Sequence, residues 1–403
     1  MVVVAFTLTG VIITLGFVGN YLFKRTGIPD NLILILFGFL LGPVFKAVDP
    51  NSLAIIVPYL SALSLLIILF DGGMSLKLYK VLEESPKALL LGGLGVAASV
   101  LVTTAFTHLL FNWDVIYGLL LGTIIGGTSS SIILSLVSRM DIPERVVTLL
   151  SLESVFTDAI VVVVGIAILE VITTPEVAGQ AFSAAQGIAG AFSIGGMVGL
   201  LVGVVWLRVL QSLKGETNDD IMTLAISLSF YAIVESLGGN GAIFALVFGL
   251  VLGNGVEISG ILRMREPFEV SEIMRKFMSQ MSFFVRTYFF VYLGLIIFIE
   301  NLILVFFGAA LAGLLLLGRT AVVYLITGDD PVLGENRRLI SLMLPRGLAA
   351  AIMAQIVIST NIEYASMFPD IIIIVIISTV VISSVGSFLT SRSMRSREAD
   401  LPA

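Results

Sequence analysis

The sequence predicts an all-α polytopic membrane protein, and three observations lead to that class. Of the 403 residues, 58% are hydrophobic and only 12% are charged, and the mean hydropathy of +1.09 exceeds what a soluble surface tolerates. Long apolar runs recur from Val2 to the C-terminal end with short polar breaks. These runs are unbroken, whereas a membrane barrel shows alternating segments of about 10 residues. We therefore expect one membrane unit over residues 1–403.

The composition also excludes several classes of function. No cysteine is present, which excludes disulfides, thiolate metal sites and cysteine nucleophiles. The net charge is −6 and the basic residues form no cluster suited to nucleic acid. We expect membrane lipid as the surroundings and no resident cofactor.

The apolar runs predict about thirteen transmembrane spans, because a helix needs about 20 apolar residues to cross about 30 Å of hydrocarbon. The first run lacks a preceding basic region and a following cleavage site, so we interpret it as a retained helix and not as a signal peptide. The expected spans are residues 2–23, 30–46, 52–76, 86–111, 115–138, 144–170, 186–210, 219–237, 240–255, 272–299, 301–327, 336–359 and 366–391.

The Lys and Arg residues of the loops predict the orientation. Loops after odd-numbered spans and the C-terminal tail carry eighteen of them, whereas the opposite loops carry only Lys46. This asymmetry predicts an inner-membrane protein with an external N-terminus and a cytoplasmic C-terminus. The eighteen are Lys24, Arg25, Lys77, Lys80, Lys87, Arg139, Arg145, Arg208, Lys214, Arg263, Arg265, Arg275, Lys276, Arg337, Arg338, Arg392, Arg395 and Arg397.

An odd number of spans permits two inverted six-helix repeats, an arrangement common among secondary transporters. Spans one to six (2–170) would form the first repeat, span seven (186–210) a linker helix, and spans eight to thirteen (219–391) the second repeat. Residues 392–403 would form a cytoplasmic tail. Interrupted segments fall in matching places, the fifth and twelfth spans, so we expect the transport site there.

The fifth span is interrupted by small and polar residues. The run from Gly122 to Ser131 contains three glycines and five hydroxyl side chains where a plain helix favours Leu or Ala. Close helix packing alone also explains small residues. The density of hydroxyls favours an unwound segment, in which Thr128, Ser129 and Ser130 are candidate cation ligands.

The twelfth span carries Pro345 beside Arg346 about ten residues into an apolar segment. A proline removes a helix hydrogen bond, which predicts a break or a simple kink. At a break, two half-helix ends would meet, and Arg346 would help to neutralise their dipoles.

The sixth span contains two carboxylates, Glu153 and Asp158. Ionisable groups inside a span cost about 2.5–3.5 kcal/mol on insertion scales, so both are functional candidates. Ser154 shares the helix face of Asp158, and Glu153 lies on another face. Desolvation raises the pKa of a carboxylate and a bound cation lowers it, so a proton and Na+ or K+ would compete at Asp158. We expect Glu153 to form a structural ion pair with Arg346.

Two further charged residues are accessory candidates. Asp71 lies near the cytoplasmic end of the third span, where it would line the entry path or contact the core. A solvated helix end is an equal alternative. Arg286 lies deeper in the tenth span, and we expect a carboxylate beside it. The partner of Arg319 in the eleventh span is not assigned, and snorkelling toward the interface is one possibility.

The segment Glu153-Ser-Val-Phe-Thr-Asp158, the segment Phe-Asp71-Gly-Gly-Met, the segment Pro345-Arg346-Gly-Leu-Ala and the span count together resemble the monovalent cation:proton antiporters of the NhaP/Kef type. The resemblance covers essentially the full chain. It implies broken fifth and twelfth spans that cross in a mobile core domain, a dimerisation domain, a homodimer and elevator-like transport. It also matches Asp158 to the ion-binding aspartate, Thr157 to the residue before it, Thr128–Ser130 to the unwound segment, and Glu153 and Arg346 to a structural salt bridge.

The expected function is therefore antiport of a monovalent cation against H+, not enzyme catalysis. We expect Na+, with K+ or Li+ as alternatives. The family commonly has Asn-Asp or Asp-Asp at Thr157-Asp158 and a carboxylate in the fifth-span break. This chain has a single candidate carboxylate, which favours electroneutral exchange. The rival hypotheses are a cation channel, which would want a symmetric filter, and an intramembrane aspartyl protease built on Asp71 and Asp158.

Overall fold

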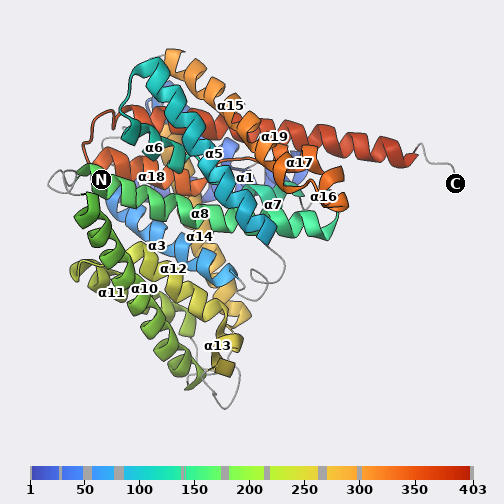
Figure 1. Ribbon diagram of the computed structural model, residues 1–403. Helices are drawn as coiled ribbons and strands as arrows, with labels where there is room; N and C mark the ends of the chain where they lie inside the picture. The colour runs from blue at the N-terminus through green and yellow to red at the C-terminus, as the bar shows by residue number, and fades with distance from the viewer. Residues whose placement is uncertain are drawn as a thin grey trace. The chain divides into compact units, whose positions relative to one another are not determined.

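The computed structural model is helical throughout the part of the chain that it describes, with no strand in that part (Figure 1). This agrees with the predicted all-α class. The described residues are 2–26, 30–48, 57–76, 86–137, 140, 142–173, 181–212, 218–261, 270–296 and 302–399.

The chain divides into two compact units, and three of the four divisions fall inside helices, namely α3 (Val57–Ser75), α8 (Glu144–Thr173) and α14 (Glu272–Ile296). Unit 1 comprises residues 1–58, 85–165 and 286–403, and unit 2 comprises residues 59–84 and 166–285. Both units draw on the two predicted repeats, and the inverted relation between those repeats remains a prediction.

Most helices belong to unit 1. They are α1 (Val2–Thr26), α2 (Asp30–Phe39), the π-helical turn η1 (Leu40–Val44), α5 (Pro86–Phe111), α6 (Val115–Ile124), α7 (Ser130–Val137), most of α8 (Glu144–Thr173), the C-terminal part of α14 (Glu272–Ile296), α15 (Leu302–Ile326), α16 (Pro331–Glu335), α17 (Arg337–Leu342), α18 (Leu348–Ser359) and α19 (Met367–Ala399). Helix α15 packs on both α5 and α19 (Figure 1). Unit 2 contains α3 (Val57–Ser75), α10 (Ala181–Ser212), α11 (Asp219–Ser236), α12 (Gly241–Gly253) and α13 (Gly255–Ile261).

Within the described residues, five helices are long and apolar enough to cross a membrane: α5, α8, α10, α15 and α19. The pair α12 and α13, bent by 79°, makes a sixth if it is one span. Several other apolar helices are shorter, among them α6 and α18, which are parts of interrupted segments. The chain is a membrane protein, and the count of thirteen spans remains a prediction.

Within unit 2, helices α3 and α12 approach each other closely. Gly73 of α3 faces the backbone of Leu246 and Leu250, and Gly249 of α12 faces the carbonyl of Phe70. At both glycines a Cβ atom would overlap backbone atoms of the other helix. Small residues let helix backbones approach in this way, which compensates for the weak hydrophobic driving force between helices in lipid.

In unit 1, the buried Asp330 anchors the segment between α15 and α17. It caps α16 by accepting from Leu333 N–H at 3.2 Å, and it pairs with Lys87 of α5 at 3.3 Å and Arg145 of α8 at 2.8 Å. Burial opposes its ionisation, but these hydrogen bonds and charges outweigh burial and lower its pKa. Asp330 therefore fixes the start of the twelfth-span segment to two other helices.

The seam between α3 and α12 gives a stability prediction. We expect Gly249→Ala to lower the thermal unfolding midpoint of the detergent-purified protein, because overpacking costs about 1–3 kcal/mol. Gly72→Ala is the control, since Gly72 lies on α3 beside Gly73 but has nothing within 4 Å of a Cβ position. The control should be unchanged or more stable. Equal losses of stability in the two variants would contradict the close contact between α3 and α12 as the cause.

Candidate functional site

The predicted interruption of the fifth span is present in unit 1. Helix α6 ends at Ile124 and α7 begins at Ser130, and all residues between them are buried. Gly126 and Gly127 lie in this break, where they lower the helix propensity of the chain. The first break, residues 125–129, thus places unwound backbone inside the protein, as lipid requires.

The predicted interruption of the twelfth span is also present. Helix α17 ends at Leu342 and α18 begins at Leu348, and the second break, residues 343–347, is buried throughout. Pro345 lies at its centre and has no N–H to continue a helix. The outcome is a break and not a simple kink.

The two breaks contact each other directly. Ser129 N–H donates to the Pro345 carbonyl at 2.7 Å. One guanidinium nitrogen of Arg346 donates to the carbonyls of Gly126 and Gly127 at 2.8 and 2.9 Å. These two carbonyls follow the end of α6 and accept hydrogen bonds from a buried cation. The role of Arg346 in neutralising the half-helix dipoles stays a prediction.

Helix α19 supplies hydroxyl groups that satisfy the second break. Thr379 Oγ1 accepts from Arg346 N–H at 3.1 Å, and Ser383 Oγ accepts from Leu344 N–H at 3.3 Å. Neither residue is among those predicted from the sequence. Their spacing of four places them on one helix face, a signal that would have indicated a polar stripe in the thirteenth span.

Helix α8 adds the predicted hydroxyl residues to the first break. Thr128 N–H donates to Thr157 Oγ1 at 3.1 Å, the two hydroxyl oxygens lie 3.4 Å apart, and Thr157 Oγ1 donates to the Ser154 carbonyl at 3.1 Å. Ser154 Oγ in turn donates to the Ser151 carbonyl at 2.9 Å. The structure therefore brings Thr128, Thr157 and Ser154 together.

Asp158 lies on this same turn of α8 and is half-buried. Gly127 packs so closely against Thr157 and Val161 that a Cβ atom would lie 2.7 Å from a methyl group of Val161. The turn of α8 that carries Asp158 therefore abuts the first break. The side chain of Ser130, the remaining predicted ligand, lies outside the described structure.

The predicted ion pair between Glu153 and Arg346 is wrong. Glu153 instead forms a bidentate pair with Arg319, at 2.5 and 2.8 Å, and Arg319 Nε also donates to the Ile340 carbonyl at 3.1 Å. Both side chains of the pair are buried. Arg346 does not pair with Glu153, and its guanidinium instead donates to two carbonyls of the first break. Arg319, whose partner the sequence did not assign, thus ties α15 to α8 and α17.

Comparison with known proteins identifies the family. The family described as "Sodium/hydrogen exchanger, transmembrane" matches residues 10–392 of this chain. The chain belongs to this family. The resemblance to monovalent cation:proton antiporters that the sequence indicated is thereby confirmed.

Individual relatives agree with membership in the sodium/hydrogen exchanger family. The K+/H+ antiporter NhaP2 of Shewanella oneidensis is 28% identical over 386 residues, which are 94% of this chain and 64% of that protein. The chain thus spans about two thirds of the length of this relative. A probable Na+/H+ antiporter 2 of Methanocaldococcus jannaschii is 26% identical over 369 residues, 86% of this chain and 82% of that protein.

A solved structure shares the fold of this family member. The sodium proton antiporter MjNhaP1 from Methanocaldococcus jannaschii at pH 8 superimposes with a TM-score of 0.77 at 19% identity, and 97% of each chain is covered.

The two accessory candidates of this family member have partners of their own. Asp71 accepts from Ser282 Oγ at 3.0 Å, a contact between α3 and α14 within unit 2. Arg286 lies 3.6 Å from Asp30, which confirms the expected carboxylate and links α14 to α2 within unit 1. Both contacts join helices within one unit.

The corrected ion pair predicts a specific energetic coupling. Glu153→Gln and Arg319→Met should each destabilise the purified protein by about 3–5 kcal/mol, because each leaves a buried charge without its partner. The double variant should lose less than the sum, with a coupling energy of about 0.5–3 kcal/mol in thermal unfolding. A parallel cycle between Glu153→Gln and Arg346→Met is the control. A larger coupling in that cycle would contradict the pairing.

Proposed function

We propose that the chain is a secondary antiporter that exchanges Na+ or K+ for H+ across the membrane. The observation that carries the proposal is the contact of two helix breaks in unit 1, beside the turn of α8 that bears Asp158. Broken helices that expose backbone ends near the middle of a membrane protein are typical of ion sites in secondary transporters. Membership in the sodium/hydrogen exchanger family and the names of both relatives support the same function.

The proposed exchange centres on the carboxylate of Asp158. A proton and a monovalent cation would each neutralise this group, and neither binds while the other occupies it. The hydroxyl oxygens of Thr128 and Thr157, which lie 3.4 Å apart, are candidate ligands from the first break and α8. The carbonyls of Gly126 and Gly127 accept from Arg346, so they are less available to the cation than the hydroxyls. Competition for one site is sufficient for antiport without a second acid.

Exchange at one carboxylate is electroneutral, since one cation replaces one proton. In the proposed assignment Glu153 is not the second acid, because its two oxygens bind Arg319. The choice between Na+ and K+ stays open, and the relatives carry both names.

Orientation and assembly belong to the same proposal. The distribution of Lys and Arg supports an inner-membrane protein with its N-terminus outside and its C-terminus in the cytoplasm. The odd number of predicted spans permits the inverted repeats, and the family resemblance implies a homodimer. Neither is needed for the chemistry proposed at Asp158.

The central variant is Asp158→Asn. In proteoliposomes that enclose a pH-sensitive dye, pulses of Na+ or K+ should move protons with the unaltered protein and not with Asp158→Asn, because asparagine binds no exchangeable proton. Asp114→Asn is the matched control, since Asp114 is an exposed carboxylate at the start of the same interrupted segment. It should retain exchange. Full activity of Asp158→Asn would overturn the proposal.

The same proteoliposomes test stoichiometry and the channel alternative. One-for-one exchange predicts that the initial rate is unchanged by an imposed membrane potential. A steep dependence on potential would contradict electroneutrality but not antiport. A cation current that follows the potential without proton movement would instead support a channel.

A further inference from the structure

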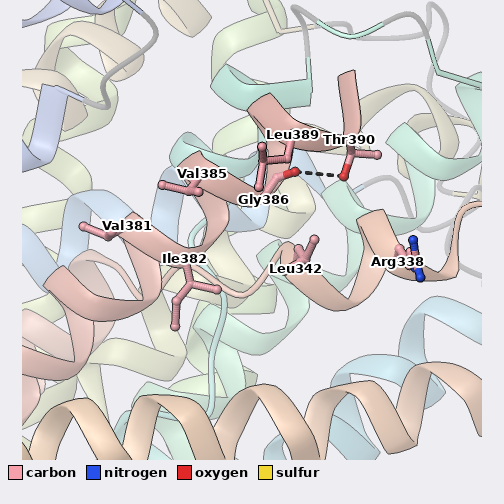
Figure 2. Close-up of a pocket in the computed structure, with 8 residues that line it drawn as sticks. All are labelled: Arg338, Leu342, Val381, Ile382, Val385, Gly386, Leu389 and Thr390. Atoms are coloured by element: carbon pink, nitrogen blue, oxygen red, sulfur yellow. Dashed lines mark hydrogen bonds between the residues drawn. The ribbon is translucent and has the colours of Figure 1, made fainter. Parts of the chain in front are cut away.

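A groove of about 560 Å³ lies between α17 and α19, beside the end of α17 at Leu342 (Figure 2). Its volume lies within the range of roughly 300–1,000 Å³ that is usual for small-molecule sites. Its walls are mostly aliphatic, and Val385 and Leu389 are 51% and 59% exposed. The lining residues are Arg338, Leu342, Val381, Ile382, Val385, Gly386, Leu389 and Thr390.

The local fold explains why the surface is hollow there. Helix α17 packs against α19 and ends at Leu342, where the buried second break begins. Gly386 leaves no side chain where α19 meets α17, and a Cβ atom there would lie 3.0 Å from the side chain of Leu342. Leu342 and Gly386 are therefore in close contact where the groove crosses from one helix to the other.

The groove is polar at one end only. Arg338 is exposed on α17, and Figure 2 shows its guanidinium apart from the row of aliphatic side chains on α19. The hydroxyl of Thr390 donates within its own helix to Gly386 at 2.8 Å, so Arg338 supplies the charge of the lining. The sequence adds Arg392, Arg395 and Arg397 to the part of α19 that follows. All four arginines are at the predicted cytoplasmic side.

We propose that this groove binds one acyl chain of an anionic phospholipid whose phosphate contacts Arg338. The aliphatic walls match a hydrocarbon chain, and a guanidinium binds phosphate through paired, charge-assisted hydrogen bonds. A free phosphate ion would leave the aliphatic walls uncovered, and a lipid without net charge would leave the positive end unmatched. Anionic lipids are abundant in the cytoplasmic leaflet, where basic side chains attract them.

Such a lipid would contact the helix that leads into the second break. Leu342 is the last residue of α17, and it precedes the segment that carries Pro345 and Arg346. The lipid would thus stabilise α17 on α19 and leave the polar crossing of the breaks untouched. This site is separate from the proposed ion exchange and does not depend on it.

Lipid binding to the detergent-purified full chain tests the site. Native mass spectrometry with phosphatidylglycerol and phosphatidylcholine of identical acyl chains should show tighter binding of phosphatidylglycerol. Arg338→Gln should weaken phosphatidylglycerol binding about fivefold, because one basic residue near a lipid surface contributes about that factor, whereas Arg338→Lys should retain most of it. Val385→Trp should fill the groove and reduce binding of both lipids. Phe388→Trp is the matched control, since Phe388 is exposed on the same helix and does not line the groove.

Three results would overturn the site. The first is an unchanged lipid preference in Arg338→Gln together with its loss when Arg392, Arg395 and Arg397 are neutralised. The second is displacement of phosphatidylglycerol by inorganic phosphate alone. The third is an equal effect of Val385→Trp and Phe388→Trp, which would indicate only the lipid that surrounds any membrane helix. Val381→Trp fills the same groove and replaces Val385→Trp if that variant does not elute as the folded protein.

Discussion

Backbone that leaves the helical path inside a membrane must have all its polar groups paired, and unit 1 is organised around this constraint. An unpaired peptide group in hydrocarbon costs several kcal/mol. Polar groups of the two breaks pair with each other. The N–H of Ser129 donates to the carbonyl of Pro345, and the guanidinium of Arg346 donates to carbonyls of the first break. Helix α19 contributes Thr379 and Ser383, which accept from the N–H groups of Arg346 and Leu344. The position of each break therefore depends on the other, and α8 and α19 must pack where they do.

The two buried arginines Arg319 and Arg346 are stabilised by different kinds of hydrogen-bond partner. Arg319 has a carboxylate, Glu153, which it engages with two nitrogens. Arg346 instead donates to the carbonyls of Gly126 and Gly127, which follow the end of α6 in the first break. This division gives Glu153 and Asp158 different roles on one helix, although they are only five residues apart. The first joins α8 to α15, and the second is the group to which we assign exchange.

Local features of the sequence predicted local features of the structure. Glycines and hydroxyls in the fifth span and Pro345 in the twelfth gave both breaks, because low helix propensity acts over a few residues. The partner of Glu153, in contrast, was not predicted correctly. Arg319 and Arg346 are both far from Glu153 in the sequence, and their depth in the membrane did not distinguish them. Which one reaches Glu153 depends on how α15 packs against α8 and α17, and a single sequence does not contain that information.

Asp158 is the proposed shared site of cation and proton. The most direct test of this proposal is the dependence of cation affinity on pH. In proteoliposomes, the Na+ or K+ concentration for half-maximal exchange should rise about tenfold for each unit of pH lowered below the pKa of the site, while the maximal rate stays constant. That pattern is expected of competition at one carboxylate. A half-saturating concentration that is constant across pH while the maximal rate changes would mean that proton and cation bind at different sites, and would contradict the account.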